Sequence, residues 1–209
     1  MERLASGPMD QLTPGQRADL ERFADAVEAS PHNLVSSRAR SELRSRHVPE
    51  SVAFARMLPP GPARVLDIGS GGGFPGLVVA VTRPDLQVEL LDSTRKKTEF
   101  LRGVAVELGL GVVVHTGRAE ELGRGELHAA FDAVTARAVA SLDRLITLAV
   151  PFLRPGGTLY AIKGERWAEE VDGAADVLRR AGARIAATPL DTGGGGDGAT
   201  PRVVSIVRN

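Results

Sequence analysis

In the N-terminal part of the chain, apolar side chains recur with the period of an amphipathic helix. Within residues 13–30 they occupy positions i, i+3, i+4 and i+7, namely Leu20, Phe23, Ala24 and Val27. A second helical stretch is predicted for residues 36–58, with an interruption at Pro49, because proline lacks the N–H that a helix interior needs. The run Pro-Pro-Gly-Pro at residues 59–62 follows. We therefore expect a helical extension over residues 1–60.

Beyond this break, short apolar runs alternate with helical segments, an order typical of a parallel sheet with helices on both faces. The predicted strands cover residues 64–68, 87–91, 112–115, 131–136, a run ending at Lys163, 184–188 and 202–207. Three predicted helices cover residues 75–83, 141–153 and 165–181. Another predicted helix is capped by Ser93 or Thr94 and ends at Gly109. We expect one Rossmann-like α/β core over residues 61–209, with a mostly parallel seven-stranded sheet.

The first predicted strand runs into a glycine-rich turn, Asp67-Ile-Gly-Ser-Gly-Gly-Gly-Phe-Pro-Gly. Glycine lacks a Cβ, so its backbone can take a positive φ and approach a ligand closely. The spacing of the glycines is compatible with either of two classes of ligand. Residues 71–76 satisfy the Gly-x-Gly-x-x-Gly pattern of dinucleotide sites. The run from Asp67 to Gly73 resembles the first motif of class I methyltransferases, which bind S-adenosylmethionine.

The charge beside the turn favours the second ligand. A dinucleotide brings a pyrophosphate to the helix N-terminus, whereas S-adenosylmethionine brings a sulfonium, an ammonium and one carboxylate. The acidic side chain of Asp67 suits those cations, although it can instead hydrogen-bond the amides of the turn. The turn Leu-Arg-Pro-Gly-Gly at residues 153–157 resembles the one before the fifth strand of class I methyltransferases, and it also favours S-adenosylmethionine over NAD.

Three further strand ends supply candidate cofactor contacts. Asp92 ends the second predicted strand, where a carboxylate accepts hydrogen bonds from ribose hydroxyls in both classes of fold. Ala119 and Glu120 follow the third strand and are expected to face the adenine. Arg137 ends the fourth strand, at the edge where open α/β sheets bind ligands. The alternative interpretation is that Arg137 is an ordinary surface arginine with no ligand contact.

Composition narrows the classes of function. The chain holds 26 basic and 26 acidic residues, so attraction to nucleic acid must come from local clusters. The absence of cysteine excludes disulfides, thiolate metal sites and a cysteine nucleophile, and the 4 histidines show no ligand spacing, so we expect no metal. No apolar run approaches the length of a membrane span, and we expect a soluble, cytoplasmic monomer.

Several motifs together resemble the RsmG (GidB) family, whose members methylate N7 of a guanine in 16S ribosomal RNA. The resemblance covers about residues 30–208. It rests on Asp67 to Gly76 with the Pro-Gly ending, Leu90-Leu-Asp-Ser93, Arg95-Lys-Lys97, Arg137-Ala-Val-Ala-Ser-Leu142, Lys163-Gly164 and Pro201-Arg202. Val35, where the family favours threonine, and the long glycine run at residues 193–198 depart from the family pattern. These departures concern the contacts made by local loops. They do not change the class of protein that the other motifs indicate.

This resemblance implies a class I methyltransferase fold, S-adenosylmethionine as the methyl donor, and 16S rRNA or the small ribosomal subunit as the substrate. Guanine N7 carries an unshared electron pair, so orientation and electrostatics suffice and no general base is needed. The implied cofactor contacts are Gly69, Gly71, Gly73, Phe74, Asp92, Ala119, Glu120 and Arg137. The implied RNA contacts are Arg95, Lys96, Lys97, Lys163 and Arg202. The catalytic candidates are Arg137 and Lys163.

Alternatives remain for some of these residues and for the function. Lys163 can instead pair with a buried carboxylate, and His47 is either structural or an RNA-side residue. The arginine-rich stretch over residues 31–64 is either a solvated helix surface or one that contacts phosphates. An NAD(P)-dependent oxidoreductase and a ribosome assembly factor with a vestigial cofactor pocket are the rival functions.

Overall fold

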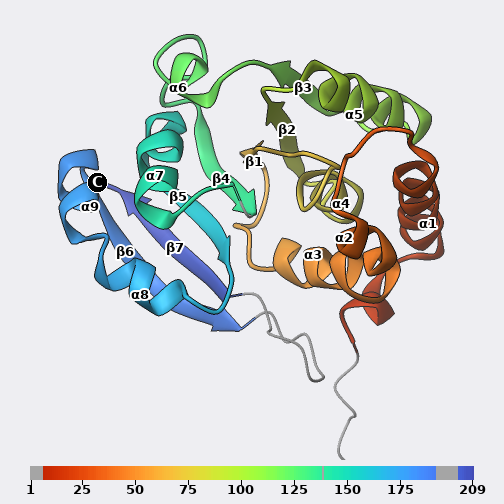
Figure 1. Cartoon of the computed structure of the whole chain (residues 1–209), viewed down its shortest axis with the longest axis horizontal. Coiled ribbons are helices and arrows are strands. Elements are labelled where there is room, and N and C mark those ends of the chain that lie inside the picture. The colour runs from red at the N-terminus through yellow and green to blue at the C-terminus, as the bar shows by residue number, and fades with distance from the viewer. Residues whose placement is uncertain (1–6, 138, 192–201) are drawn as a thin grey trace, which may run out of the picture.

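A single sheet organises the protein, whose computed structural model describes residues 7–137, 139–191 and 202–209. The seven strands lie in the order β3-β2-β1-β4-β5-β7-β6 (Figure 1). They are β1 (Ala63–Ile68), β2 (Leu86–Asp92), β3 (Val113–Thr116), β4 (Phe131–Arg137), β5 (Leu153–Lys163), β6 (Ala183–Asp191) and β7 (Arg202–Arg208). β7 runs antiparallel to β5 and β6, and the other neighbouring pairs are parallel. This confirms the predicted fold class, while the glycine run at 193–198 lies outside the described residues.

Helices cover both faces of the sheet (Figure 1). They are α1 (Pro14–Ala29), α2 (Ser37–Ser41), α3 (Val48–Ala55), α4 (Gly76–Thr82), α5 (Arg95–Glu107), α6 (Ala119–Leu122), α7 (Leu142–Ala149), α8 (Trp167–Asp172) and α9 (Ala175–Ala181). Successive strand residues face opposite sides. Val65 of β1 therefore joins the core under α1, α3, α4 and α5, whereas Leu66 joins the core under α7 and α9. Burial on both faces explains why the strands appear in the sequence as short apolar runs.

The helices before β1 pack onto the core of the sheet. Phe23 of α1 is fully buried against Phe74 of the glycine turn, with ring centroids 4.8 Å apart. The second helical stretch is interrupted by a π-helical turn at Leu43–His47, and α3 begins at Val48. The interruption thus falls just before Pro49, next to its predicted position, and Pro49 lies in the first turn of α3. Proline is tolerated there because the N–H that it lacks has no partner within the helix.

The chain between α7 and β5 also departs from the prediction. The helix predicted over residues 141–153 gives way to a 3-10 turn, and β5 begins at Leu153. Leu153 pairs with Phe131 of β4, but the next paired residues are Thr158 and Ala133. The Arg-Pro-Gly-Gly turn therefore bulges out of the strand pair instead of preceding the strand.

One predicted helix is divided into two shorter ones. The helix predicted over residues 165–181 is divided into α8 and α9 at Gly173, a residue type that weakens a helix interior. None of the described helices combines the length and the apolar character that crossing a membrane would require.

Candidate active site

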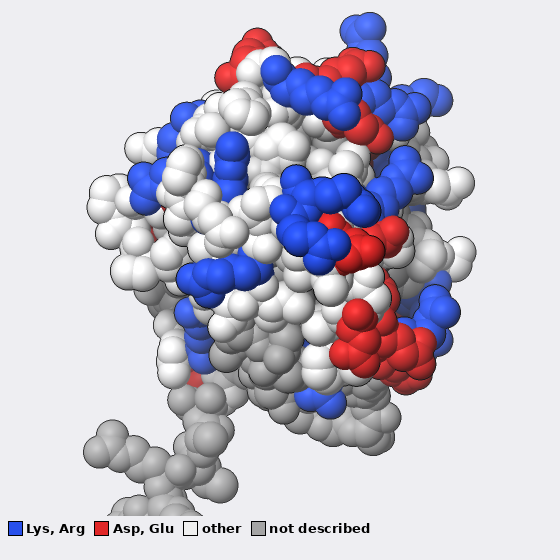
Figure 2. All heavy atoms as spheres, turned by 90° about the vertical axis from the view of Figure 1, so that its left-hand side faces the viewer, with Lys and Arg blue, Asp and Glu red and all other residues white. Residues whose placement is uncertain are grey.

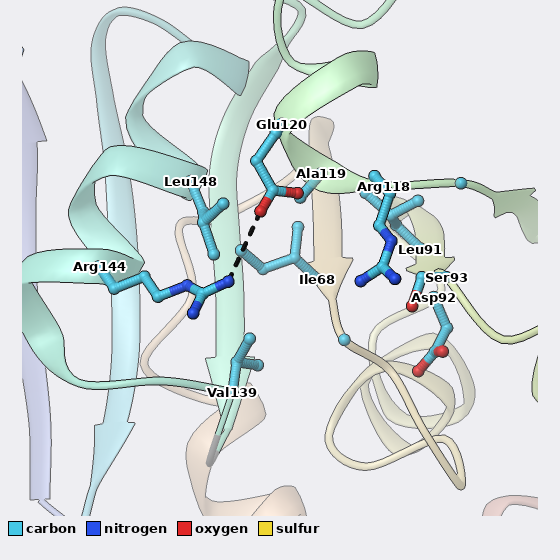
Figure 3. A pocket seen from close by; sticks show the side chains of 12 residues that line it. Ile68, Leu91, Asp92, Ser93, Arg118, Ala119, Glu120, Val139, Arg144 and Leu148 are labelled. Carbon is cyan, nitrogen blue, oxygen red and sulfur yellow. Dashed lines mark ion pairs between the residues drawn. The ribbon is translucent and has the colours of Figure 1, made fainter.

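A pocket of about 300 Å³ opens beyond the carboxyl ends of β1 to β4. This is the edge at which open α/β sheets bind their ligands. Its walls are formed by Ile68, Gly69, Leu91, Asp92, Ser93, Gly117, Arg118, Ala119, Glu120, Val139, Arg144 and Leu148 (Figure 3). Of the predicted cofactor contacts, the structure brings together Gly69, Asp92, Ala119 and Glu120. They meet because parallel strands end at a common edge.

The glycine turn reaches this pocket at Gly69. Its φ of 66° lies in the left-handed region, and φ is also positive at Gly71 (54°) and Gly73 (97°). A Cβ added at Gly69 would lie 2.8 Å from Cγ2 of Val139, so both the backbone angle and the space favour glycine. The sharp turn predicted after the first strand is confirmed.

Asp92 joins the glycine turn to the start of α5. It is the last residue of β2, and its side chain is buried. One carboxylate oxygen accepts a hydrogen bond from the N–H of Gly71 at 3.0 Å, and the other accepts one from the N–H of Thr94 at 2.8 Å. Each oxygen retains a lone pair that a ligand hydroxyl can use. Asp92 is therefore both a wall of the pocket and a brace for the turn.

Two charged side chains face each other across the pocket. Nη2 of Arg144 on α7 lies 3.8 Å from Oε1 of Glu120 on α6 (Figure 3). With 68% and 45% of the two side chains exposed, this pair contributes little stability. Arg144, Leu148 and Val139 also line the pocket, and no sequence motif predicted this role for them. A usable signal is the i, i+4 spacing of Arg144 and Leu148 in the helix that follows the fourth strand.

Asp67 lies behind the turn and does not line the pocket. Its side chain is 1% exposed, and one carboxylate oxygen accepts a hydrogen bond of 2.7 Å from the hydroxyl of Thr135. The other oxygen has no hydrogen-bond partner among the described residues. A Cβ added at Gly76 would lie 2.7 Å from that oxygen, so the start of α4 packs directly on it. This placement corrects the hypothesis that Asp67 meets the cations of the ligand.

Burial raises the pKa of Asp67 to about 6, and the hydrogen bond from Thr135 opposes that shift. The folded protein therefore binds this proton more tightly than the unfolded chain does. The resulting stability is fully present below about pH 4 and is lost as pH rises through about 6. Relative to Asp67→Asn, which cannot titrate, the wild-type free energy of unfolding should fall by about 2 kcal/mol between pH 4 and pH 7. Urea titrations of both proteins measure this difference, and a pH-independent difference would contradict the assignment.

Phe74, Arg137 and His47 form a second group, where the glycine turn meets the N-terminal helices. The guanidinium of Arg137 lies 5.3 Å from the centroid of the Phe74 ring, and its Nη1 donates to Nδ1 of His47 at 3.1 Å. Because arginine only donates, His47 carries its proton on Nε2. Burial and then the charge of Arg137 lower the pKa of His47 to about 4, so this imidazole is neutral at pH 7. Burial also lowers the pKa of Arg137.

This second group lies outside the pocket lining. Of the predicted cofactor contacts, Phe74 packs on Phe23, and a Cβ at Gly73 would lie 2.9 Å from that same ring. Gly71 donates to Asp92 and is likewise not part of the lining. The cofactor roles of these residues and of Arg137 stay predictions.

Lys163 ends β5 and is only 8% exposed. Its ammonium pairs with Oε2 of Glu170 on α8 at 2.7 Å and donates to the carbonyl oxygen of Ala140 at 2.8 Å. The same glutamate oxygen accepts a hydrogen bond of 2.6 Å from the N–H of Leu142. The alternative that Lys163 pairs with a carboxylate is confirmed, although the side chain of Glu170 is 26% exposed rather than buried.

The other cations predicted to contact RNA lie at the starts of α5 and β7. Arg95 and Lys96 are exposed and Lys97 is half-buried. Arg95 pairs at 2.8 Å with a glutamate one helical turn away. Arg202 is the first residue of β7 and lies opposite Lys163 in the ladder between β5 and β7. These cations do not line the pocket.

The pocket lies within a region of the chain that matches a known protein family. The GidB family model, described as rRNA small subunit methyltransferase G, matches residues 16–190 and so includes every residue of the pocket lining. The chain belongs to the GidB family. The family resemblance inferred from the sequence motifs is thereby confirmed.

Two relatives show how far the GidB similarity extends. The Ribosomal RNA small subunit methyltransferase G of Sorangium cellulosum is 48% identical over 163 residues, and that of Mycobacterium leprae is 45% identical over 153 residues. These alignments cover 75% and 72% of this chain. They cover 68% and 62% of the respective relatives.

Solved structures share the fold of this GidB-family chain at low sequence identity. A mutein of the branched-chain polyamine synthase of Thermus thermophilus aligns with 100% of the chain and 71% of its own length, with a TM-score of 0.65 at 17% identity. The mitomycin 7-O-methyltransferase MmcR aligns with 94% of the chain and 69% of its own length, with a TM-score of 0.62 at 18% identity. This similarity supports the fold alone.

Proposed function

We propose that this protein transfers the methyl group of S-adenosylmethionine to N7 of a guanine in 16S ribosomal RNA, either in the free RNA or in the small ribosomal subunit. Membership of the GidB family, together with a pocket that presents Asp92 at the end of β2, carries this proposal. The matching relatives are named for rRNA small-subunit methylation. The polyamine synthase of similar fold was solved with 5′-methylthioadenosine, an adenosine that bears a thioether.

The residues of the pocket fit this methyl donor. Asp92 has lone pairs for the ribose hydroxyls, and the apolar side chains of Ile68, Leu91 and Leu148 suit an aromatic ring and its sugar. Ala119 lines the pocket just after β3, the strand beyond β2, and this supports adenine binding at that end of the pocket. The donor supplies a methyl group on a positively charged sulfur, already activated for displacement.

Methyl transfer to guanine N7 requires the side chains only to position the two reactants. Guanine N7 offers its lone pair without first losing a proton, so no residue has to act as a base. Neither carboxylate of the pocket is required as a base, because Asp92 accepts two backbone N–H bonds and keeps its other lone pairs for the ribose, and Glu120 faces Arg144. The residues therefore act by holding the donor and the target nitrogen in line.

RNA binding has to depend on local basic clusters. On the face shown in Figure 2, lysine and arginine are scattered over the surface as separate groups, and aspartate and glutamate lie beside them mainly at the top and on the right-hand side. On the N-terminal helices, Arg44 pairs with three carboxylates of α1 and Arg46 pairs with two glutamates. This pairing favours an ion-paired helix surface there. Phosphate contacts are assigned instead to Arg95, Lys96, Lys97 and Arg202.

Lys96→Ala tests this assignment. Loss of one phosphate contact should weaken RNA binding about two- to fivefold and reduce the slope of log affinity against log salt by about 1. Binding of S-adenosylmethionine should not change, because Lys96 is not part of the pocket lining. Fluorescence anisotropy with a 16S rRNA fragment over a range of salt concentrations measures the first effect. Arg179→Ala is the control, since this exposed arginine of α9 pairs with Asp176 and is assigned no phosphate contact, and an equal loss in both variants would contradict the specific role of Lys96.

A methyl-transfer assay tests the function itself. With radiolabelled S-adenosylmethionine and small subunits from a strain that lacks the modification, the protein should label 16S rRNA. Mass spectrometry should then place the methyl group on N7 of one guanine. A protein that binds the donor but leaves the RNA unlabelled would be an assembly factor. A protein that binds NAD and not S-adenosylmethionine in calorimetry would be an oxidoreductase, and either outcome overturns the proposal.

A further inference from the structure

The segment that follows β4 supplies one wall of the pocket. Val139 lines the pocket, and its Cγ2 lies so close to Gly69 that a Cβ there would be 2.8 Å away. Figure 3 shows the side chain of Val139 below those of Arg144 and Ile68, on the segment that leaves β4. The position of this side chain therefore decides the shape of the pocket over Gly69.

The order of the strands assigns Val139 to the reactive end of the donor. The sheet runs β3, β2, β1, β4, β5. Under the proposed function the adenine lies beyond β3 and the ribose meets Asp92 at the end of β2. The sulfur and its methyl group must then lie further along the same edge, toward β1 and β4. Val139 follows β4 and contacts Gly69 at the end of β1, so it flanks the place where the methyl group is transferred.

Two charged side chains hold this segment from its far side. Lys163 donates to the carbonyl oxygen of Ala140 at 2.8 Å, and Glu170 accepts from the N–H of Leu142 at 2.6 Å. The two side chains are joined to each other at 2.7 Å. Ala140 and Leu142 are thereby attached, through one ion pair, to the end of β5 and to α8.

This arrangement is stiffer than contacts between neutral groups. Hydrogen bonds to an ionised partner are about twice as strong as those between neutral groups. Lys163 is nearly inaccessible to water, so its charge depends on Glu170 and on the carbonyl of Ala140 for stabilisation. Removal of one member leaves the other charge without its partner, which is costly for a buried group. The segment is therefore expected to shift if either side chain is removed.

We propose that Lys163 and Glu170 are positioning residues that clamp residues 139–142 and thereby hold Val139 against the reactive end of the donor. This rests on the proposed function and deepens it. It assigns to Lys163 a role through Val139 rather than a contact with RNA, and it adds Glu170, which the motifs of the sequence did not indicate.

Steady-state kinetics of the full chain with S-adenosylmethionine and 16S rRNA test the clamp. Glu170→Ala and Lys163→Met should each lower kcat about ten- to a hundredfold, because a displacement of about 1 Å at the reacting atoms costs that much. The KM for S-adenosylmethionine should change less than about threefold, since Asp92 and the adenine end of the pocket are untouched. Glu169→Ala, which alters the exposed neighbour of Glu170 on α8, is the matched control and should retain wild-type kcat.

A double variant separates positioning from stability. Lys163→Met with Glu170→Leu removes both charges, and such a replacement of an ion pair restores much of the lost stability. The thermal midpoint should therefore recover relative to the single variants. The kcat should stay low, because Ala140 and Leu142 have still lost their partners. Trp167, the only tryptophan of the chain, lies on α8, and its fluorescence reports whether this helix remains folded.

A double-mutant cycle tests the route through Val139. If the clamp acts by placing Val139, then Val139→Gly should lower kcat, and adding Glu170→Ala should lower it by less than about threefold more. Fully additive losses would overturn the proposed route. Normal kcat in Glu170→Ala with a large loss in Lys163→Met would overturn the clamp and return Lys163 to RNA contact. An inactive wild-type chain in the same assay would overturn the proposed function instead, so the two failures are distinguishable.

Discussion

Replacing Asp92 by alanine should weaken the binding of S-adenosylmethionine about ten- to a hundredfold. Two effects combine. The ribose hydroxyls lose their acceptor, a change that costs about 1 to 3 kcal/mol. The amides of Gly71 and Thr94 also lose the carboxylate oxygens that they now contact at 3.0 and 2.8 Å, so the glycine turn loses its brace. Titration calorimetry with S-adenosylmethionine, or with its demethylated product, measures the change.

Asp92→Asn distinguishes these two effects. Asparagine keeps the size of the side chain and one acceptor oxygen, but its amide nitrogen cannot accept from a backbone N–H. The affinity of Asp92→Asn for S-adenosylmethionine should therefore lie between the affinities of the wild type and of Asp92→Ala. Glu107→Ala, an exposed change at the end of α5, is the control for the loss of a carboxylate. Unchanged donor binding in Asp92→Ala would show that the pocket beyond β2 is not the donor site.

Gly69→Ala should lower kcat/KM for methyl transfer about ten- to a hundredfold. The φ of 66° at this position costs an alanine about 1 kcal/mol. The added Cβ would also lie 2.8 Å from Cγ2 of Val139, and relief of that overlap displaces either the glycine turn or the segment after β4. Overpacking of this kind typically costs a further ~1 to 3 kcal/mol. Both displacements act directly on the pocket, so donor binding and methyl transfer should fall together.

Gly109→Ala is a closely matched control for Gly69→Ala. Its φ is 65°, but a Cβ there meets nothing within 4 Å, and Gly109 is outside the pocket lining. We expect this variant to lose about 1 kcal/mol of stability and to keep wild-type activity. If the two alanine variants lose activity equally, backbone strain alone would account for the effect and the contact with Val139 would be irrelevant.

Local patterns were enough to predict the strands and the residues at their ends. The core strands are buried on both faces, so they appear as apolar runs, and the glycine turn follows directly from the first of them. Gly69, Asp92, Ala119 and Glu120 were found because each lies at or just after the end of a parallel strand, and such ends share one edge of the sheet. The same argument could not separate Asp67 from the pocket, because it does not tell which face of the strand is covered by α4.

The amino-acid sequence by itself thus determined the class of fold and the edge of the sheet that binds a ligand. It also determined most of the residues around the proposed adenosine site. These features depend on the periodicity of apolar residues or on which residues are neighbours in the sequence. The partners of the longer side chains depended on folding. Val139 contacts Gly69 because β4 lies next to β1 in the sheet. Arg137 contacts His47 because the N-terminal helices pack beside the end of β4. Lys163 contacts both Glu170 and Ala140 because β5 lies next to β4 and α8 packs beside it. Such contacts join segments whose spacing in the chain carries no periodic signal, so the three-dimensional packing alone selects them.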